Sequence, residues 1–507
     1  MTAIVETAKG KLSGALSGNV AVFRGVPYAA PPLGALRWAP PAPHPGWTGT
    51  RDATRDGPAP PQLPSRLERV MGRVDFANGQ DEDCLTLTIS APWPAAGGKR
   101  PVLVFFHGGA WMSGAGSLSL YGGAELARFG DAIVVGVNYR LGALGYLHVP
   151  ALPASGSGAN FGLLDHVAAL EWVRDNIAAF GGDPANVTIF GQSAGGGSIA
   201  TLMEMPNAVT LFRRAILQSA AIMPHQTPEA AARVTAEVLK ALGLESAAKL
   251  RDVPVAKVLD AQRAAMMAVG KPSDPTPVYR MVRDGAVLTT DPPAGVAAGC
   301  AKGIDVMIGT THDEVHAFFI NNEAIANIDR AGMAAALKGS ERIAAMPKAE
   351  AVIEAYAKRL PGASAPALFA AVRTDGMFRL PSLRFADAQE KHARVFVYRF
   401  DWKPAADAPY GAAHCIELPF VFGNFADWDN APVPPTMLKG GNRAAMTRLS
   451  HQMMGAWCAF ARTGDPNHAG LPKWDPWSRA QRRSFVFDAE SRPAAGLDDE
   501  IEAVWKN

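Results

Sequence analysis

The stretch Val187-Thr-Ile-Phe-Gly-Gln-Ser-Ala-Gly-Gly-Gly197 decides the fold of this chain. Four strand-forming residues run directly into the pattern Gly-x-Ser-x-Gly, and small residues suited to a closely packed helix follow. Gly191 and Gly195 leave the room that a strained turn needs where neighbouring chains come close. The pattern predicts a strand, a tight turn and a helix, with Ser193 at the apex as a candidate nucleophile. A chance match is the alternative, but the pattern occurs only once in the chain.

A second glycine-rich turn follows the apolar run Val102–Phe106, where the sequence reads His107-Gly-Gly-Ala-Trp111. Glycines at a strand end free the backbone to turn its amides toward a reacting oxygen. Alone, this segment would be interpreted as an ordinary strand-end turn. Beside Ser193, it predicts that the N–H groups of Gly109, Ala110 and Ala194 bind a developing oxyanion.

Several short runs rich in β-branched residues predict buried strands. The apolar residues of 163–180 recur three or four positions apart, and two glycines follow, which predicts a helix. Strand, helix and strand at this spacing form a βαβ unit, so the fold class is α/β with a partly parallel sheet. The predicted strands are Cys84–Ser90, Pro101–Phe106, Ala132–Tyr139, Val187–Phe190, Arg214–Gln218, Ile304–Ile308, Val395–Phe400 and Ser484–Phe487.

The rest of the chain predicts one domain, residues 1–507, with helical additions at about 226–300 and 322–390. The first addition starts at Thr227-Pro228, a cap followed by a first-turn proline, and its first helix stops near Gly243. We expect both additions to pack over the sheet and to shape the site. Proline-rich residues 57–64 are expected to form a surface loop.

Bulk composition excludes several classes of function. The 507 residues are 48% hydrophobic and carry 49 basic and 47 acidic side chains, so the formal net charge is only +2. Such a balance gives no reason to expect a nucleic acid, an anionic membrane or a polyanionic substrate. The expected partner is a small, mostly uncharged molecule.

The cellular setting is predicted from what the sequence lacks. The N-terminus has no basic segment leading into an apolar run, and no stretch reaches the length of a membrane helix. Four cysteines (Cys84, Cys300, Cys415 and Cys458) suit neither a disulfide framework nor the paired spacings of a zinc site. We expect a reduced, cytoplasmic protein.

The ordered motifs of the chain, taken together, resemble those of the type-B carboxylesterases, the family of bacterial para-nitrobenzyl esterases and cholinesterases. The resemblance runs essentially from end to end. It implies an α/β-hydrolase fold with a mostly parallel central sheet flanked by helices, and a serine carboxylesterase that acts on a small ester without cofactor or metal. We expect a monomer or a weak homo-oligomer. The motifs are 23–38, 82–85, 138–142, 180–184, 191–196, 374–378 and 464–467.

The resemblance also selects the partners of Ser193. Among eleven histidines, the segment 411–423 resembles the family's histidine motif and makes His414 the base. Glu314, at the end of a predicted strand, resembles the acid that orients it, and the order Ser193, Glu314, His414 is the one this fold uses. Asp313 is the competitor, and Val315 departs from the glycine usual after the acid.

Further residues are expected to support or line the site. Ser219 is interpreted either as support for the histidine or as an ordinary strand-end residue. Trp111, Phe318, Phe319 and Phe378 are candidates for an acyl or alcohol pocket, although aromatic residues are more often plain core.

Three alternatives to ester hydrolysis stay open. The same residues would also cleave carbamates or aryl amides. His312 and His316 lie four apart, as metal ligands on a helix do, but a third ligand is not evident. A non-catalytic binding relative would be expected to lack Ser193 or His414.

Cholinesterases carry Glu before the serine, whereas this chain has neutral Gln192, so we expect uncharged esters as substrates.

Overall fold

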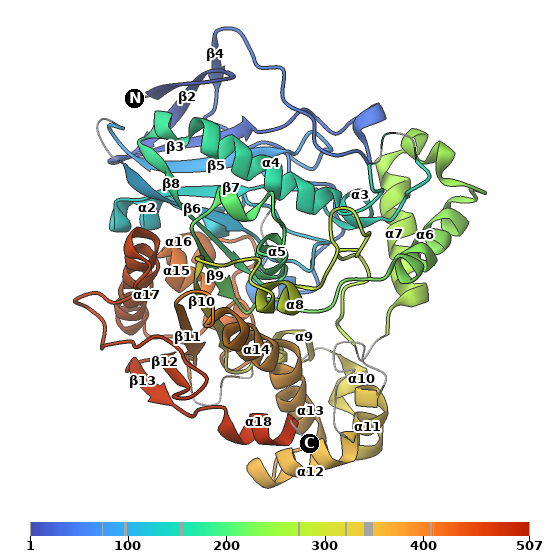
Figure 1. The fold of residues 1–507 in the computed structure, drawn as a ribbon, viewed down its shortest axis with the longest axis vertical. Helices are drawn as coiled ribbons and strands as arrows, with labels where there is room; N and C mark the ends of the chain where they lie inside the picture. The colour runs from blue at the N-terminus through green and yellow to red at the C-terminus, as the bar shows by residue number, and fades with distance from the viewer. Residues whose placement is uncertain are drawn as a thin grey trace.

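A computed structural model describes most of the chain (Figure 1). The residues it describes are 2–73, 75–95, 99–152, 154, 156–271, 274–319, 322–338, 348–405, 408 and 410–505.

One large twisted sheet runs through the centre of the molecule (Figure 1). In the described residues, its order is β1-β2-β3-β5-β7-β6-β8-β9-β10-β11-β12-β13, with β4 paired to β2. All neighbours from β7 to β12 pair in parallel, as the βαβ prediction requires. These strands are β7 (Ile133–Val137), β6 (Arg100–Phe106), β8 (Gly182–Gln192), β9 (Arg214–Gln218), β10 (Asp305–Thr311), β11 (Val395–Phe400) and β12 (Arg483–Phe487).

Antiparallel strands extend both edges of the parallel part. Short connections join β1 to β2, β2 to β3 and β12 to β13, which parallel strands do not allow. They are β1 (Thr2–Thr7), β2 (Gly10–Ser17), β3 (Val20–Pro27), β5 (Thr86–Pro92) and β13 (Arg492–Ala495), while β4 (Thr50–Asp52) adds a short parallel pairing.

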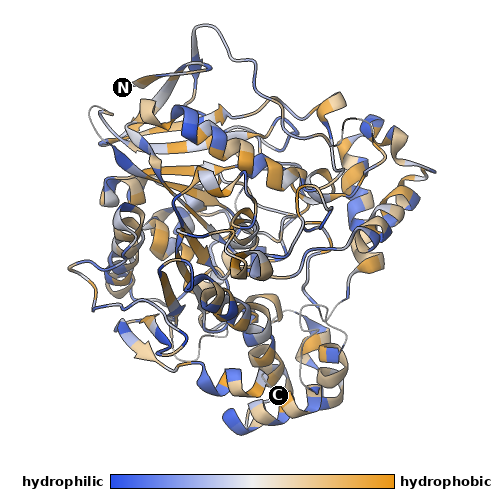
Figure 2. Ribbon diagram, viewed as in Figure 1, coloured by the Kyte–Doolittle hydropathy of each residue, from blue (hydrophilic) through white to orange (hydrophobic). Residues whose placement is uncertain are grey.

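The alternation of side chains along β6 separates two hydrophobic cores. Val102, Val104 and Phe106 face the core covered by α4 (Phe161–Asn176) and α5 (Ala194–Leu202). The intervening Leu103 and Phe105 face the core covered by α2 (Ala124–Gly130) and α17 (Arg443–Thr463). Because both faces are covered, the central strands are continuous apolar runs, which Figure 2 shows as mostly hydrophobic ribbon.

Helices occur in both ranges expected to be additions, between 228 and 297 and between 323 and 389. In the first, the Thr227 hydroxyl accepts a hydrogen bond from Ala230 N (3.2 Å), and Gly243 ends α6 in the left-handed conformation. Figure 1 shows α6 and α7 side by side at one side of the sheet. The second addition also contains residues 339–347, which lie outside the described residues. The helices of the two additions are α6 (Pro228–Leu242), α7 (Val255–Val269), α8 (Pro292–Ala297), α10 (Glu323–Ala326), α11 (Arg330–Lys338), α12 (Ala349–Arg359), α13 (Ala365–Thr374), a π-helical turn (Asp375–Arg379) and α14 (Leu380–Gln389).

Residues 57–64 form a loop, as expected, but the expectation that this loop lies at the surface is wrong for its middle. Residues 59–62 are buried, because the side chain of Gln62 binds the backbone of the turn after β6. Its amide donates to Gly114 O (2.9 Å) and accepts from Gly114 N (2.6 Å). Residues 63–73 and 75–80, called the flap below, carry the short helix α1 (Glu68–Met71).

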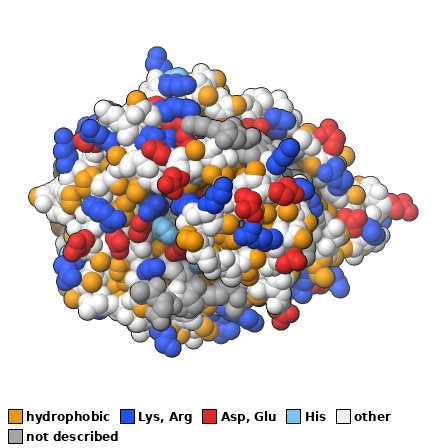
Figure 3. Space-filling view, turned by 90° about the horizontal axis from the view of Figure 1, so that it is seen from below, with side chains coloured by type: hydrophobic (Ala, Val, Ile, Leu, Met, Phe, Trp, Pro, Cys, Tyr) orange, Lys and Arg blue, Asp and Glu red, His pale blue; other side chains and the backbone are white. Residues whose placement is uncertain are grey.

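The surface is mixed in charge. Basic and acidic side chains are interspersed on the face seen in Figure 3, in line with the small net charge. Across the part of the chain that the structure describes, no helix has both the length and the apolar character to cross a bilayer.

Candidate active site

Ser193 sits at a strained turn between β8 and α5. Its backbone has φ 57° and ψ −119°, outside the regions that non-glycine residues favour. The strain is held by three hydrogen bonds: Ser193 N donates to Gln218 O (2.9 Å), and Ser193 O accepts from Gly197 N (2.9 Å) and Ala221 N (3.0 Å). A Cβ at Gly195 would lie 1.9 Å from Phe106 O, so glycine is required there.

Three backbone amides next to Ser193 are available to a ligand. Gly109, Ala110 and Trp111 all have positive φ values (107°, 58° and 57°), which turns this segment back on itself. In the described residues, neither Gly109 N nor Ala110 N donates a backbone hydrogen bond. Ala194 is the first residue of α5, and a first-turn amide has no acceptor within its own helix. The fold thus leaves the three amides named from the sequence unpaired.

His414 is joined to Glu314 deep in the same site. The two come from different elements: Glu314 follows β10, and His414 lies just before α15 (Leu418–Phe422). His414 Nδ1 lies 2.5 Å from Glu314 Oε2, and both side chains are buried. Glu314 Oε1 accepts from Thr311 N (2.8 Å), which fixes the carboxylate. Since the Nδ1–H of His414 donates a hydrogen bond to Glu314, Nε2 carries the lone pair of the neutral ring.

Asp313, the competitor of Glu314, points elsewhere. It accepts from His312 Nδ1 (2.9 Å) and from Ala412 N (2.9 Å). Burial disfavours its charge, but the hydrogen bond and charge of His312 outweigh burial and lower the pKa of Asp313 to about 2. In the described ranges, no group of three or more His, Cys, Asp or Glu side chains is placed to hold a metal ion.

Two of the four predicted pocket aromatics flank the histidine. The ring centroids of Phe318 and Phe378 lie 5.1 and 4.9 Å from that of His414, and both residues line the cavity that contains Ser193. The positive φ of Trp111 turns its side chain into the core behind α5, where Nε1 donates to Ser198 Oγ (2.9 Å). Phe319 stacks on Phe369 in the helical addition.

Ser219 lies at the end of β9, with φ 45° and its N–H bound to Gly309 O (2.8 Å). Among the described residues, no hydrogen bond links its hydroxyl to His414. The position fits the strand-end interpretation of Ser219.

Two polar residues lie beside His414 in positions that the sequence did not predict. Gln192 Nε2 lies 3.1 Å from His414 Nε2. Glu417, three residues after His414, accepts from Gln218 Nε2 (3.2 Å) and is buried near Glu314. Burial, with repulsion from Glu314, raises the pKa of Glu417 to about 8, so this carboxyl is protonated at neutral pH. Their place beside the histidine depends on how separate elements pack, which no local motif signals.

The cavity in front of Ser193 has a volume of about 360 Å³. The flap contributes one wall, α7 and the π-helical turn contribute others, and the turn after β6 forms the floor. Four methionines (Met71, Met112, Met266 and Met377) line it. Such a site suits a largely apolar molecule that presents one polar group to the unpaired amides.

This fold and site define a carboxylic ester hydrolase of the α/β-hydrolase fold, and the comparisons with known proteins agree. The chain belongs to the carboxylesterase family, whose model matches residues 1–503. The predicted family and fold are therefore confirmed.

Relatives match along nearly the whole chain. It is 38% identical over 489 residues to the para-nitrobenzyl esterase of Bacillus subtilis (strain 168), covering 96% of this chain and 95% of that protein. It is 35% identical to a probable N-octanoylanthranilate hydrolase of Rhodococcus erythropolis, over 94% of this chain and 96% of that one. A crystal structure of a Geobacillus stearothermophilus carboxylesterase superposes with a TM-score of 0.86 at 36% identity and covers 99% of both chains.

Proposed function

We propose that this carboxylesterase hydrolyses uncharged carboxylic esters through an acyl intermediate on Ser193. The observation that carries the proposal is the His414–Glu314 hydrogen bond in the cavity that also holds Ser193. A serine hydroxyl is a poor nucleophile until a neighbouring imidazole takes its proton. In the neutral ring, His414 Nε2 carries no hydrogen, so it can accept the proton of the Ser193 hydroxyl.

The reaction proceeds in two acyl transfers. As Ser193 Oγ attacks the ester carbonyl, its proton passes to His414 Nε2, and Glu314 holds the ring and stabilises its charge. The amides of Gly109, Ala110 and Ala194 bind the oxyanion. The protonated ring then protonates the leaving alcohol, and a water activated by His414 releases the acid and frees Ser193.

Hydrolysis of para-nitrophenyl esters from acetate to dodecanoate, by wild type and Ser193→Ala side by side, tests the proposal. We expect the wild type to cleave short esters and the Ala variant to fall to background. Equal rates would refute Ser193 as the nucleophile. EDTA is expected to leave the wild-type rate unchanged; loss of activity restored by zinc would favour the alternative at His312 and His316.

Aryl amides and carbamates are the second candidate class for the same residues. The relative named as an N-octanoylanthranilate hydrolase acts, by that name, on an acyl group joined to a nitrogen. A panel of one acyl group attached to an aryl alcohol and to the corresponding aryl amine, together with the matching carbamate, separates the classes. We expect the ester to give the highest kcat/KM.

We further propose that the protein works in the cytoplasm as a monomer or weak homo-oligomer. All four cysteines are free, and Cys84, Cys415 and Cys458 are buried, which suits a reducing compartment. Cell fractionation and light scattering at several concentrations test these two points. Recovery outside the cytoplasm, or a tight oligomer at low concentration, would contradict them.

A further inference from the structure

Gln192, the last residue of β8, lies against the histidine of the site. Its side-chain Nε2 is 3.1 Å from His414 Nε2, and the residue is 1% exposed. The strand fixes its place, since Gln192 pairs in register with Gln218 of β9.

The direction of this hydrogen bond follows from the other side of the ring. His414 Nδ1 donates to Glu314, so Nε2 of the neutral ring is an acceptor and Gln192 is the donor. Gln192 therefore binds the Nε2 lone pair of His414, the same lone pair that must accept the proton of the Ser193 hydroxyl. Among the described residues, no hydrogen bond joins Ser193 Oγ to His414, so the amide and not the hydroxyl caps the base.

We propose that Gln192 is a positioning residue that caps His414 Nε2 in the resting enzyme and sets the pH at which the acidic limb of the rate profile falls. The inference rests on the proposed function, in which His414 is the base. During attack, the Ser193 O–H bond breaks and an N–H bond forms at Nε2. The Gln192 N–H must then withdraw, and an amide can do so because its Oε1 accepts from the protonated ring.

The effect of a neutral side chain at position 192 depends on the charges of the other groups around the His414 ring. Glu314, which follows β10, is the hydrogen-bond partner of the ring. Glu417 is protonated at neutral pH, since burial and Glu314 raise its pKa to about 8. Burial likewise raises the pKa of the Cys415 thiol and of the Tyr398 phenol on β11, so both are neutral. The flanking Phe318 and Phe378 add no charge.

A carboxylate at 192 would reverse the effect of the amide. It cannot donate to neutral Nε2, but it stabilises the protonated ring, the form that is inactive as a base. A carboxylate beside an imidazole typically moves its titration by about one pH unit or more. Gln192→Glu is therefore expected to move the acidic limb of kcat/KM up by about one unit, a roughly tenfold loss below both midpoints. At the alkaline plateau, kcat/KM of Gln192→Glu should be less than threefold below that of the wild type.

The experiment compares full pH profiles of kcat/KM for the wild type, Gln192→Glu, Gln192→Met and Gln481→Glu with para-nitrophenyl butyrate. Gln192→Met keeps the shape and removes the donor, so its limb should move up by a measurable amount that is less than half a unit. Gln481→Glu adds the same charge at an exposed residue outside the cavity lining and should leave the limb in place. Folding is checked by circular dichroism.

The outcomes separate this inference from the proposed function. If His414→Ala keeps the wild-type rate, the proposed function fails. If His414→Ala is inactive, two results would overturn only the role of Gln192. One is that Gln192→Glu loses activity equally at every pH. The other is that the acidic limbs of both Gln192 variants superpose on that of the wild type. Should Gln192→Glu not fold, the Met variant decides: an unmoved limb overturns the inference.

Discussion

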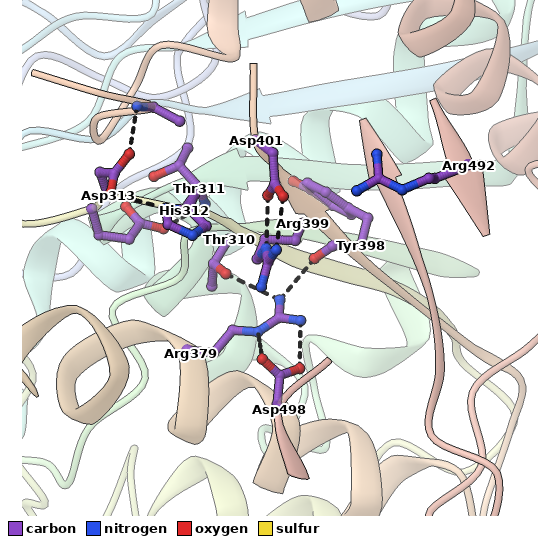
Figure 4. A network of polar contacts seen from close by, with 12 residues as sticks. Thr310, Thr311, His312, Asp313, Arg379, Tyr398, Arg399, Asp401, Arg492 and Asp498 are labelled. Atoms are coloured by element: carbon purple, nitrogen blue, oxygen red, sulfur yellow. Dashed lines mark hydrogen bonds and ion pairs between the residues drawn. The ribbon is translucent and has the colours of Figure 1, made fainter. Parts of the chain in front are cut away.

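Arg379 donates hydrogen bonds to both carboxylate oxygens of Asp498, at 3.0 and 2.7 Å, across 119 positions of the chain (Figure 4). The same guanidinium donates to Thr310 Oγ1 (3.1 Å) and to Tyr398 O (3.0 Å), so it ties β10 and β11 to the C-terminal segment. Arg379 ends the π-helical turn that carries Phe378, and Phe378 packs on His414. A buried ion pair thus holds one wall of the site.

Asp498→Asn should destabilise the protein strongly. Both side chains are only 3% exposed, and removal of one partner leaves a buried charge uncompensated, which typically costs about 3–5 kcal/mol. Urea unfolding measures the loss, and kcat should fall with it as Phe378 loosens. The matched control is Asp401→Asn, whose partner Arg399 is more exposed (14%) and should lose less than half as much. Equal losses would contradict a special role for the Arg379 pair.

Glu314→Gln should lower kcat by roughly 10³–10⁴-fold, because the amide no longer fixes the ring tautomer that leaves Nε2 free. Asp313→Asn, one residue away, should change kcat by less than threefold. Its expected cost is in stability, since it loses part of its bond to His312. Steady-state kinetics on one ester checks both variants, and the reverse pattern would assign the orienting role to Asp313.

Glu417→Gln should change how stability depends on pH. The pKa of Glu417 is raised in the folded protein to about 8, so its contribution to stability is fully present below the ordinary carboxyl pKa and is lost as pH rises toward 8. The wild type should lose up to about 1.4 kcal/mol per pH unit from this group in that window. The Gln variant, which keeps a side-chain oxygen to accept the Gln218 hydrogen bond, should have a flatter curve in urea titrations from pH 5 to 8.5. Parallel curves would show that Glu417 ionises normally.

Gln62→Leu should loosen the turn that holds the unpaired amides. The variant loses the bonds to Gly114 and to Pro60 O (2.9 Å), a cost of about 1–3 kcal/mol in stability. We expect kcat to fall roughly tenfold, less than the 100- to 1000-fold typical for a lost oxyanion donor. Hydrogen exchange at residues 108–114 should accelerate. Unchanged exchange there, with unchanged kcat, would show that the turn holds its shape alone.

Much of the sheet could be predicted from sequence, because strands covered on both faces are unbroken apolar runs. The predicted bounds of β9 and β11 match the structure. The N-terminal strands β1 to β3 were not predicted. Only one side of β1 is buried, and glycines interrupt β2, so neither presents a continuous apolar run.

The candidate catalytic residues could be predicted from the sequence more fully than the residues that line the cavity. Ser193, Glu314 and His414 stand in motifs, whereas the direction of a side chain depends on backbone angles that no motif gives. Trp111 illustrates this, because its φ of 57° turns the indole away from the cavity. The contacts of Gln192 and Arg379 each need elements far apart in the sequence to pack against one another.

The methionine-lined cavity makes the selectivity of this enzyme sensitive to oxidants. A thioether is soft and adapts to substrates of different shape, but its sulfoxide is polar and chiral. Met71 on the flap and Met266 on α7 are only partly buried, so peroxide should reach them before Met377. Mild oxidation would then make the entrance more polar while the sheet remains folded. Under the proposed function, the relative rates with apolar and polar esters would change before activity is lost, and methionine sulfoxide reductases would restore them.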